Sequence, residues 1–284
     1  MAEQPEPIFP PEIEEIIFSL CAQSDLPNSK HLIFVAKRVY AWLRPQLYKI
    51  AIFNSTRPKG LPRFDPNLLE VHGRHLRHIL LWVWTYSHEL ATYLSWCPNV
   101  VDLALWGHNI IYDRTLINQL RDLPLTHLSF DVSVFHGASM TEFPSTTISF
   151  PTVTHLEPIG LDITLTAQGI KNYFPSVTHI LGDETQGLSA RDILDCWEDQ
   201  LEVLIWYREE LTDPDLGPNN GHDLPNDPRL VLIHEDQYRE YVNEWNERAK
   251  DGPESIWRRA EGIIESRLDA GRGSNRAVRR VSAE

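Results

Sequence analysis

The feature that most constrains the fold is a short motif that recurs at nearly constant spacing. PTVTHLEP begins at Pro151 and PSVTHILG begins at Pro175, 24 residues later, and each copy follows a phenylalanine. Both copies contain an apolar residue and a second one three positions later. These are the first two apolar positions of the pattern apolar-x-x-apolar-x-apolar. The pattern recurs as LRHILL from Leu76, VVDLAL from Val100, LTHLSF from Leu125, VTHLEP from Val153, VTHILG from Val177 and LEVLIW from Leu201. These starts are 24, 25, 28, 24 and 24 residues apart, which indicates one structural unit used repeatedly.

The residues between these segments have apolar side chains at helical spacing. SHELATYLSW, RTLINQLRDL and ARDILDCWEDQ are examples, and Ser189 is a candidate N-cap of the last one. A strand and a helix in every period predict stacked units, because one unit cannot bury its own apolar face. The predicted fold class is therefore α/β, a leucine-rich-repeat-like solenoid with a parallel sheet and outer helices. The competing interpretation is an ordinary α/β domain with accidental spacing.

Composition excludes several classes of function. The formal net charge of −14 repels phosphate groups, so we expect neither a nucleic-acid partner nor an anionic membrane surface. The acidic, proline-rich start predicts no signal peptide, and the longest apolar run, ILLWVW, is too short to span a bilayer. The three scattered cysteines predict no disulfide framework and no cysteine zinc site. A cytoplasmic or nuclear location is the resulting expectation.

The first 55 residues differ in character from the repeats. FPPEIEEIIFSL has two prolines suited to a helix start, acids in the first turn, and a stripe of isoleucines and Leu20. After SDLPNSK, a second helix contains VAKRVYAW. This stretch resembles the F-box, and an F-box followed by repeats resembles the F-box/leucine-rich-repeat-like proteins of fungal type.

The resemblance implies a substrate-recognition adaptor of a Skp–cullin–F-box ubiquitin ligase. In such a protein the helical unit binds the Skp adaptor and the repeats bind a protein substrate. By position, the implied adaptor-binding residues are Pro10, Pro11, Ile13, Ile16, Ile17 and Val35. They also suit a purely structural role, packing the helical unit against the repeats. The alternative function is a repeat-based interaction scaffold with a vestigial F-box and no ligase role.

One face of the predicted sheet has a row of histidines. The position before the second apolar residue of each motif holds His78, Asp102, His127, His155, His179 and Val203. In-register stacking would place them about 4.8 Å apart. Imidazoles at that spacing suggest a metal or pH-sensing site, but ordinary half-exposed strand residues explain the row better, and a column of equal rings is not a tetrahedral site. We therefore predict no metal site and no cofactor.

Aromatic and acidic residues occupy the far end of the same face. Trp82, Trp106, Asp131, Asp183 and Tyr207 are the predicted substrate-binding residues, because solvent-facing aromatic side chains often anchor protein interfaces. The competing interpretation is that flanking loops bury these rings. No nucleophile, phosphate-loop or zinc-protease motif is present, so we predict no enzyme and no catalytic residue. A hydrolase built on the histidine row is the minor alternative.

The predicted domains are an F-box-like helical unit at 1–55, the repeat domain at 56–268 and a disordered basic tail at 269–284. Two helical segments after residue 238 are expected to cap the open end of the repeats. Residues 211–229 predict a mobile acidic loop, and RRVS resembles a kinase site at Ser282.

Overall fold

A computed structural model describes residues 9–24, 31–54, 65–82, 87–106, 114–131, 149–159, 166–183, 188–208, 225–234, 241–250 and 255–281. At 23–24, 54, 87, 114, 131, 208, 234, 241–244 and 270–281 it describes the backbone alone. Ser282 and most of the predicted mobile loop lie outside the described residues. Among the described helices, none combines the length and the apolar character needed to cross a bilayer.

The N-terminal unit consists of α1 (Pro11–Ser24), the short 3₁₀ helix η1 (Leu32–Phe34) and α3 (Lys37–Leu47). It has a small core of its own, in which Ala22, Val39 and Leu43 are buried. Arg38 on α3 forms a 2.9 Å ion pair with Glu14 on α1, which joins the two helices at the surface. The predicted helical character of this region is therefore observed.

The rest of the chain is built on one eight-stranded parallel sheet whose strands pair in chain order, β1 to β8. The strands are β1 (Ile50–Asn54), β2 (His78–Trp82), β3 (Asp102–Leu105), β4 (His127–Asp131), β5 (His155–Ile159), β6 (His179–Asp183), β7 (Val203–Arg208) and β8 (Leu230–His234). Each repeated motif contains one strand, and consecutive motifs are neighbours in the sheet. The prediction of an α/β fold with a parallel sheet is confirmed.

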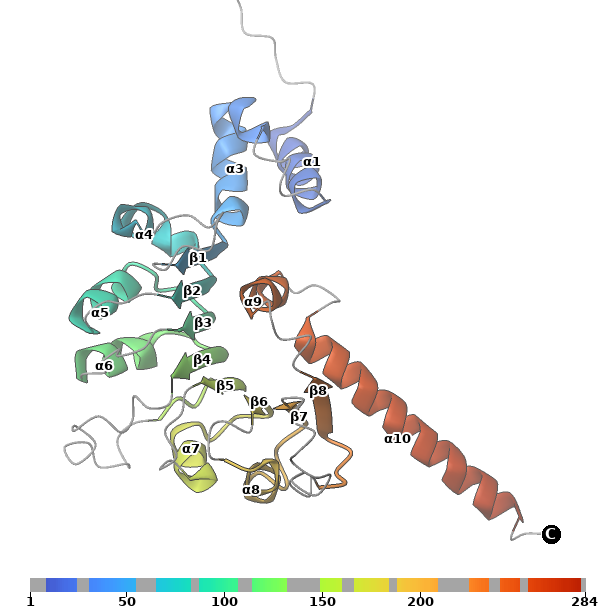
Figure 1. Cartoon of the computed structure of the whole chain (residues 1–284). Helices are drawn as coiled ribbons and strands as arrows, with labels where there is room; N and C mark the ends of the chain where they lie inside the picture. Colours follow the sequence, from blue (N-terminus) through green and yellow to red (C-terminus); the bar gives the residue numbers. More distant parts are fainter. Residues whose placement is uncertain are drawn as a thin grey trace, which may run out of the picture.

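Helices between the strands cover one face of the sheet, which we call the outer face (Figure 1). They are α4 (Pro66–His72) with η2 (Gly73–His75), α5 (Ser87–Ser95), α6 (Arg114–Asp122), α7 (Ala167–Tyr173) and α8 (Ala190–Cys196). Side chains with N-cap geometry start three of them. The Ser189 hydroxyl accepts a 3.0 Å hydrogen bond from the Asp192 amide, so the predicted N-cap of α8 is confirmed.

Alternation along the strands divides the side chains between two cores. Ile79 and Leu81 of β2 point to the outer face, where they join the largest buried cluster together with Leu90 and Leu94 of α5. His78, Leu80 and Trp82 point the other way, to what we call the inner face. The second and third apolar positions of the motif therefore point into the core between the sheet and the outer helices.

The inner face is covered by the two C-terminal helices, α9 (Tyr241–Ala249) and α10 (Ile256–Val281) (Figure 1). Trp245 and Ala249 of α9 pack on Leu80, Ala104 and Trp106. A second cluster joins α10 to the last strands and contains Trp257, Ala260, Ile264, Leu181, Ile205 and Val231. We expected these helices to cap the open end. α10 does contact β7 and β8, but α9 lies instead over the early strands, because the apolar inner side chains there also need burial.

The end of the chain also differs from the prediction. Disorder was expected from residue 269, whereas the backbone of α10 is helical to Val281. Arginine, which has high helix propensity, is frequent in this segment and offsets its two glycines, and adding a turn to an existing helix is easier than starting one.

Candidate functional site

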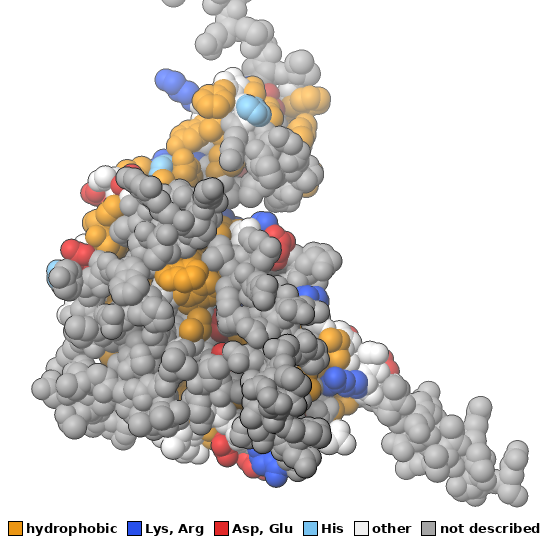
Figure 2. Space-filling model, viewed as in Figure 1, with side chains coloured by type: hydrophobic (Ala, Val, Ile, Leu, Met, Phe, Trp, Pro, Cys, Tyr) orange, Lys and Arg blue, Asp and Glu red, His pale blue; other side chains and the backbone are white. Residues whose placement is uncertain are grey.

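The first candidate site is an exposed apolar surface on the N-terminal unit. We call it the N-terminal apolar surface and define it as Phe9, Ile13, Ile16, Ile17, Leu20, Phe34 and Val35. Their exposed fractions run from 41% for Ile17 to 82% for Phe34. Figure 2 shows hydrophobic side chains gathered over this end of the molecule. A cluster of this kind on a water-facing helix pair is typical of a protein-binding surface.

The local fold explains why these side chains face solvent. Phe18 and Ala22 of α1 turn toward Val39 and Leu43 of α3 and fill the small core of the unit. The isoleucines and Leu20 lie on the other side of α1, so a second apolar stripe remains outside. α1 therefore has more apolar surface than its own unit can bury.

All six predicted adaptor-binding residues are exposed: Pro10, Pro11, Ile13, Ile16, Ile17 and Val35. The competing role of packing the unit against the repeats does not fit their exposure. Our residue-by-residue prediction missed Phe9, Leu20 and Phe34. Leu20 continues the isoleucine stripe at helical spacing, and Phe34 precedes Val35, so the sequence contained a signal for both.

The second candidate site is the predicted row of histidines on the inner face. The strand register places His78, Asp102, His127, His155, His179 and Val203 opposite one another in consecutive strands. The rings of His127 and His155 stack with centroids 4.0 Å apart, and those of His155 and His179 with centroids 4.2 Å apart. The predicted row is thus present as a stack of three imidazoles.

The threonine before each of these histidines fixes its ring. The Thr126 hydroxyl donates to the Val101 carbonyl at 3.2 Å and lies 3.0 Å from Nδ1 of His127. Thr154 repeats the arrangement with the Thr126 carbonyl and with His155, at 3.2 and 2.9 Å. When each hydroxyl donates its hydrogen to the carbonyl, the hydroxyl oxygen accepts from Nδ1–H. The Nε2 atom of each of these two neutral imidazoles is then unprotonated.

Burial keeps the central imidazoles neutral. It lowers the pKa of His155 to about 2, helped by the neighbouring His127 and His179. Burial also lowers the pKa of His127 to about 4, against the opposing attraction of Asp102. The pKa of His179 is lowered by burial as well, and Glu261 on α10 works in the opposite direction. His179 Nε2 lies 3.2 Å from the Glu261 carboxylate.

A buried ion cluster joins α9 to the same face. Arg248 donates to Glu157 at 3.0 Å and to Asp102 at 3.4 Å, and its side chain is 7% exposed. Burial alone would raise the pKa of Asp102, but Arg248, His78 and His127 together outweigh it and the pKa is lowered to about 2. The sequence indicated Asp102 as part of the row but gave no indication of its cation.

Most of the predicted substrate-binding residues do not form a solvent-exposed surface. Trp106 and Tyr207 are each 7% exposed, so the prediction that these rings face solvent is wrong. The Trp106 indole donates to the Ser129 hydroxyl at 2.6 Å and meets the ring of Trp82 edge to face. The burying elements are helices rather than loops. Trp82 and Asp183 are half-buried, and the side chain of Asp131 lies outside the described residues.

Comparison with protein-family models finds no match. Comparison with curated proteins likewise finds none that is similar to this chain.

Proposed function

We propose that the chain is a substrate-recognition adaptor of the F-box kind, which binds a Skp-type adaptor protein through its N-terminal unit. The observation that carries the proposal is the N-terminal apolar surface. The residues assigned to adaptor binding from the F-box resemblance, such as Ile13, Ile16 and Val35, are the same residues that are exposed. An amphipathic helix with an exposed isoleucine stripe suits insertion into an apolar groove of a partner protein.

The proposal extends to the rest of the chain. We interpret the sheet and its outer helices as a leucine-rich-repeat-like solenoid, supported by pairing of the strands in chain order. The protein substrate would bind near the carboxyl ends of the strands, where Trp82 and Asp183 remain half-buried, rather than over the centre of the inner face. A cytoplasmic or nuclear location, where ubiquitin ligases act, belongs to the same proposal. We assign no catalytic residue.

Co-expression with a Skp-type adaptor tests the docking proposal. Ile16→Asp places a charge on an exposed apolar residue and should abolish co-purification of the adaptor. The side chain of Ile16 is 53% exposed, so its replacement should change the free energy of unfolding by no more than about 0.5 kcal/mol.

Ala41→Asp is the matched control. Ala41 is exposed on α3, midway in sequence between the buried residues Val39 and Leu43. Two residues correspond to about 200° around a helix, so Ala41 faces away from α1. The same added charge should therefore leave co-purification intact. If the wild-type chain fails to retain the adaptor, or if Ile16→Asp retains it as well as Ala41→Asp does, the docking proposal is wrong.

The alternative is a repeat-based scaffold with no ligase role. The same exposed surface would then bind a different protein. This alternative is favoured if the wild-type chain captures a cellular partner through the N-terminal apolar surface but never a Skp-type adaptor.

A further inference from the structure

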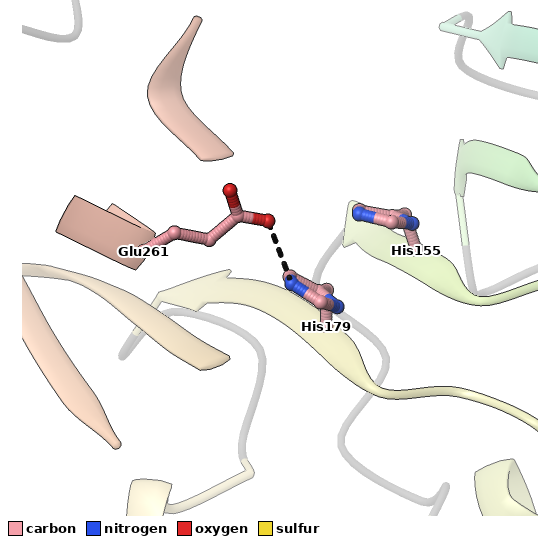
Figure 3. A group of neighbouring side chains, drawn as sticks. All are labelled: His155, His179 and Glu261. Carbon is pink, nitrogen blue, oxygen red and sulfur yellow. Dashed lines mark hydrogen bonds and ion pairs between the residues drawn. The ribbon is translucent and has the colours of Figure 1, made fainter. Parts of the chain in front are cut away.

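We propose that His155, His179 and Glu261 form a binding site for a divalent transition-metal ion of the Zn²⁺ class, between the sheet and α10. One ligand atom from each of these residues lies within 4.8 Å of the others. Figure 3 shows both imidazoles directed toward α10, with the Glu261 carboxylate reaching toward them. The sequence placed the two histidines side by side. It did not place Glu261, which lies 82 residues beyond His179.

The donor set has the composition that zinc-class ions bind. Two imidazole nitrogens and one carboxylate oxygen can hold Zn²⁺ and leave a fourth position for water. Bonds of about 2.0–2.2 Å require ligand atoms a little over 3 Å apart in a tetrahedral site. His179 Nε2 and the nearer Glu261 oxygen are 3.2 Å apart and already satisfy this spacing. His155 stacks on His179 with ring centroids 4.2 Å apart, so its side chain must turn out of the stack to direct its nitrogen at the same ion.

The surroundings of His179 prepare it as a ligand. The Thr178 hydroxyl lies 2.8 Å from Nδ1 of His179. Support of the second ring nitrogen is the usual arrangement behind a metal-bound histidine, since it fixes the ring and its tautomer. In this arrangement Nε2 is the nitrogen that faces the ion.

The site also has an apolar wall on one side and an open side through which an ion can enter. Trp257 stands edge-on to the rings of both histidines, at 5.2 and 5.7 Å, and provides an apolar wall. The Glu261 side chain is 46% exposed, so an ion can enter from that side. The net charge of −14 favours the approach of cations. On binding, the ion takes the position of the hydrogen between His179 Nε2 and Glu261, and the single N–H proton of the neutral imidazole moves to Nδ1, beside the Thr178 hydroxyl.

A bound ion would join α10 to β5 and β6. The ion binds only when helix and strands are together, so it would stabilise the folded chain in proportion to its concentration over its Kd. The site is independent of the proposed adaptor surface, which lies on the N-terminal unit.

The test uses the full chain, purified without a histidine tag and treated with a chelator. Titration with Zn²⁺ should show one tight site, and Co²⁺ should gain the stronger visible absorption of a site with fewer than six ligands. Glu261→Gln should weaken the affinity at least about 10-fold and remove the Zn²⁺-dependent rise in Tm. His155→Gln should do the same.

Glu265→Gln is the matched control, because Glu265 is exposed on α10 one turn beyond Glu261. It should bind Zn²⁺ as the wild-type chain does. Glu261 is exposed, so its variant should fold even if His155→Gln does not, and circular dichroism checks both. The chain has 12 histidines, and weak binding to the others should be equal in all variants. Equal affinity of Glu261→Gln and Glu265→Gln, or the absence of a tight site, would overturn the proposal.

Discussion

Replacing Arg248 by methionine gives the sharpest test of how α9 is held. Methionine keeps the length of the side chain but removes its charge. Asp102 and Glu157, with side chains only 3% and 7% exposed, would then lie in the interior without their cation. Removal of one member of a buried ion cluster destabilises proteins by about 3–5 kcal/mol, because the remaining charge is uncompensated. We expect a loss of this size in the free energy of unfolding.

Urea denaturation at pH 7, followed by tryptophan fluorescence, measures the effect. Lys250→Ala is the matched control, since Lys250 follows α9 directly and forms a surface pair with Glu247, with side chains 45% and 43% exposed. Its loss should cost no more than about 1 kcal/mol. Adding Asp102→Asn and Glu157→Gln to Arg248→Met should recover part of the stability, because the uncompensated charges are then gone.

The result that refutes this reasoning is an equal, small effect of Arg248→Met and Lys250→Ala. Arg248 would then be solvated, and α9 would not be packed on the inner face. An unchanged penalty in the triple variant would show that the loss comes from packing rather than from charge.

Three further outcomes are expected. Trp106→Ala should cost about 3–5 kcal/mol in urea denaturation, because the ring is buried and its indole is hydrogen-bonded; a loss below about 1 kcal/mol would restore it as a free surface residue. Gly73→Ala should destabilise the chain by about 1–3 kcal/mol, since a Cβ there would clash with the Trp96 carbonyl and lie 2.9 Å from Cys97 Sγ. Gly262→Ala, on open helix surface, should instead stabilise the chain by about 0.5–1 kcal/mol. If the Gly73 variant had the higher Tm, the packing would be contradicted. The pKa of Asp102 is lowered to about 2, so ionised Asp102 should contribute about 2–3 kcal/mol to the free energy of unfolding. This contribution should be fully present above pH 4–5 and be lost as the pH falls toward 2. The stability of Asp102→Asn should not show this loss between pH 5 and pH 2.

The strand order and register were predictable because the repeat period determines them. When each unit adds one strand, residues at equivalent positions become neighbours, and His127, His155 and His179 stack as expected. For the isoleucines on α1 the sequence left two roles open, adaptor binding and packing against the repeats, and only the structure shows that they are exposed.

The covering of the inner face was not predicted, because it depends on contacts between residues far apart in the chain. Arg248 is 146 positions from Asp102, and no periodic pattern relates them. The sequence nevertheless contained a signal, in the row of inner-face residues that lies between the histidine row and the predicted substrate-binding row. Four of the six residues in that row, Leu80, Ala104, Leu181 and Ile205, are apolar, and so many apolar residues are not expected on a solvent-facing sheet.

Hydrogen–deuterium exchange on the purified complex with a Skp-type adaptor would test the proposed function most directly. The account predicts slower exchange on adaptor binding in α1, η1 and α3, while the strands and α9 exchange as they do in the free chain. Absence of a complex, or protection confined to the sheet and the C-terminal helices, would contradict it.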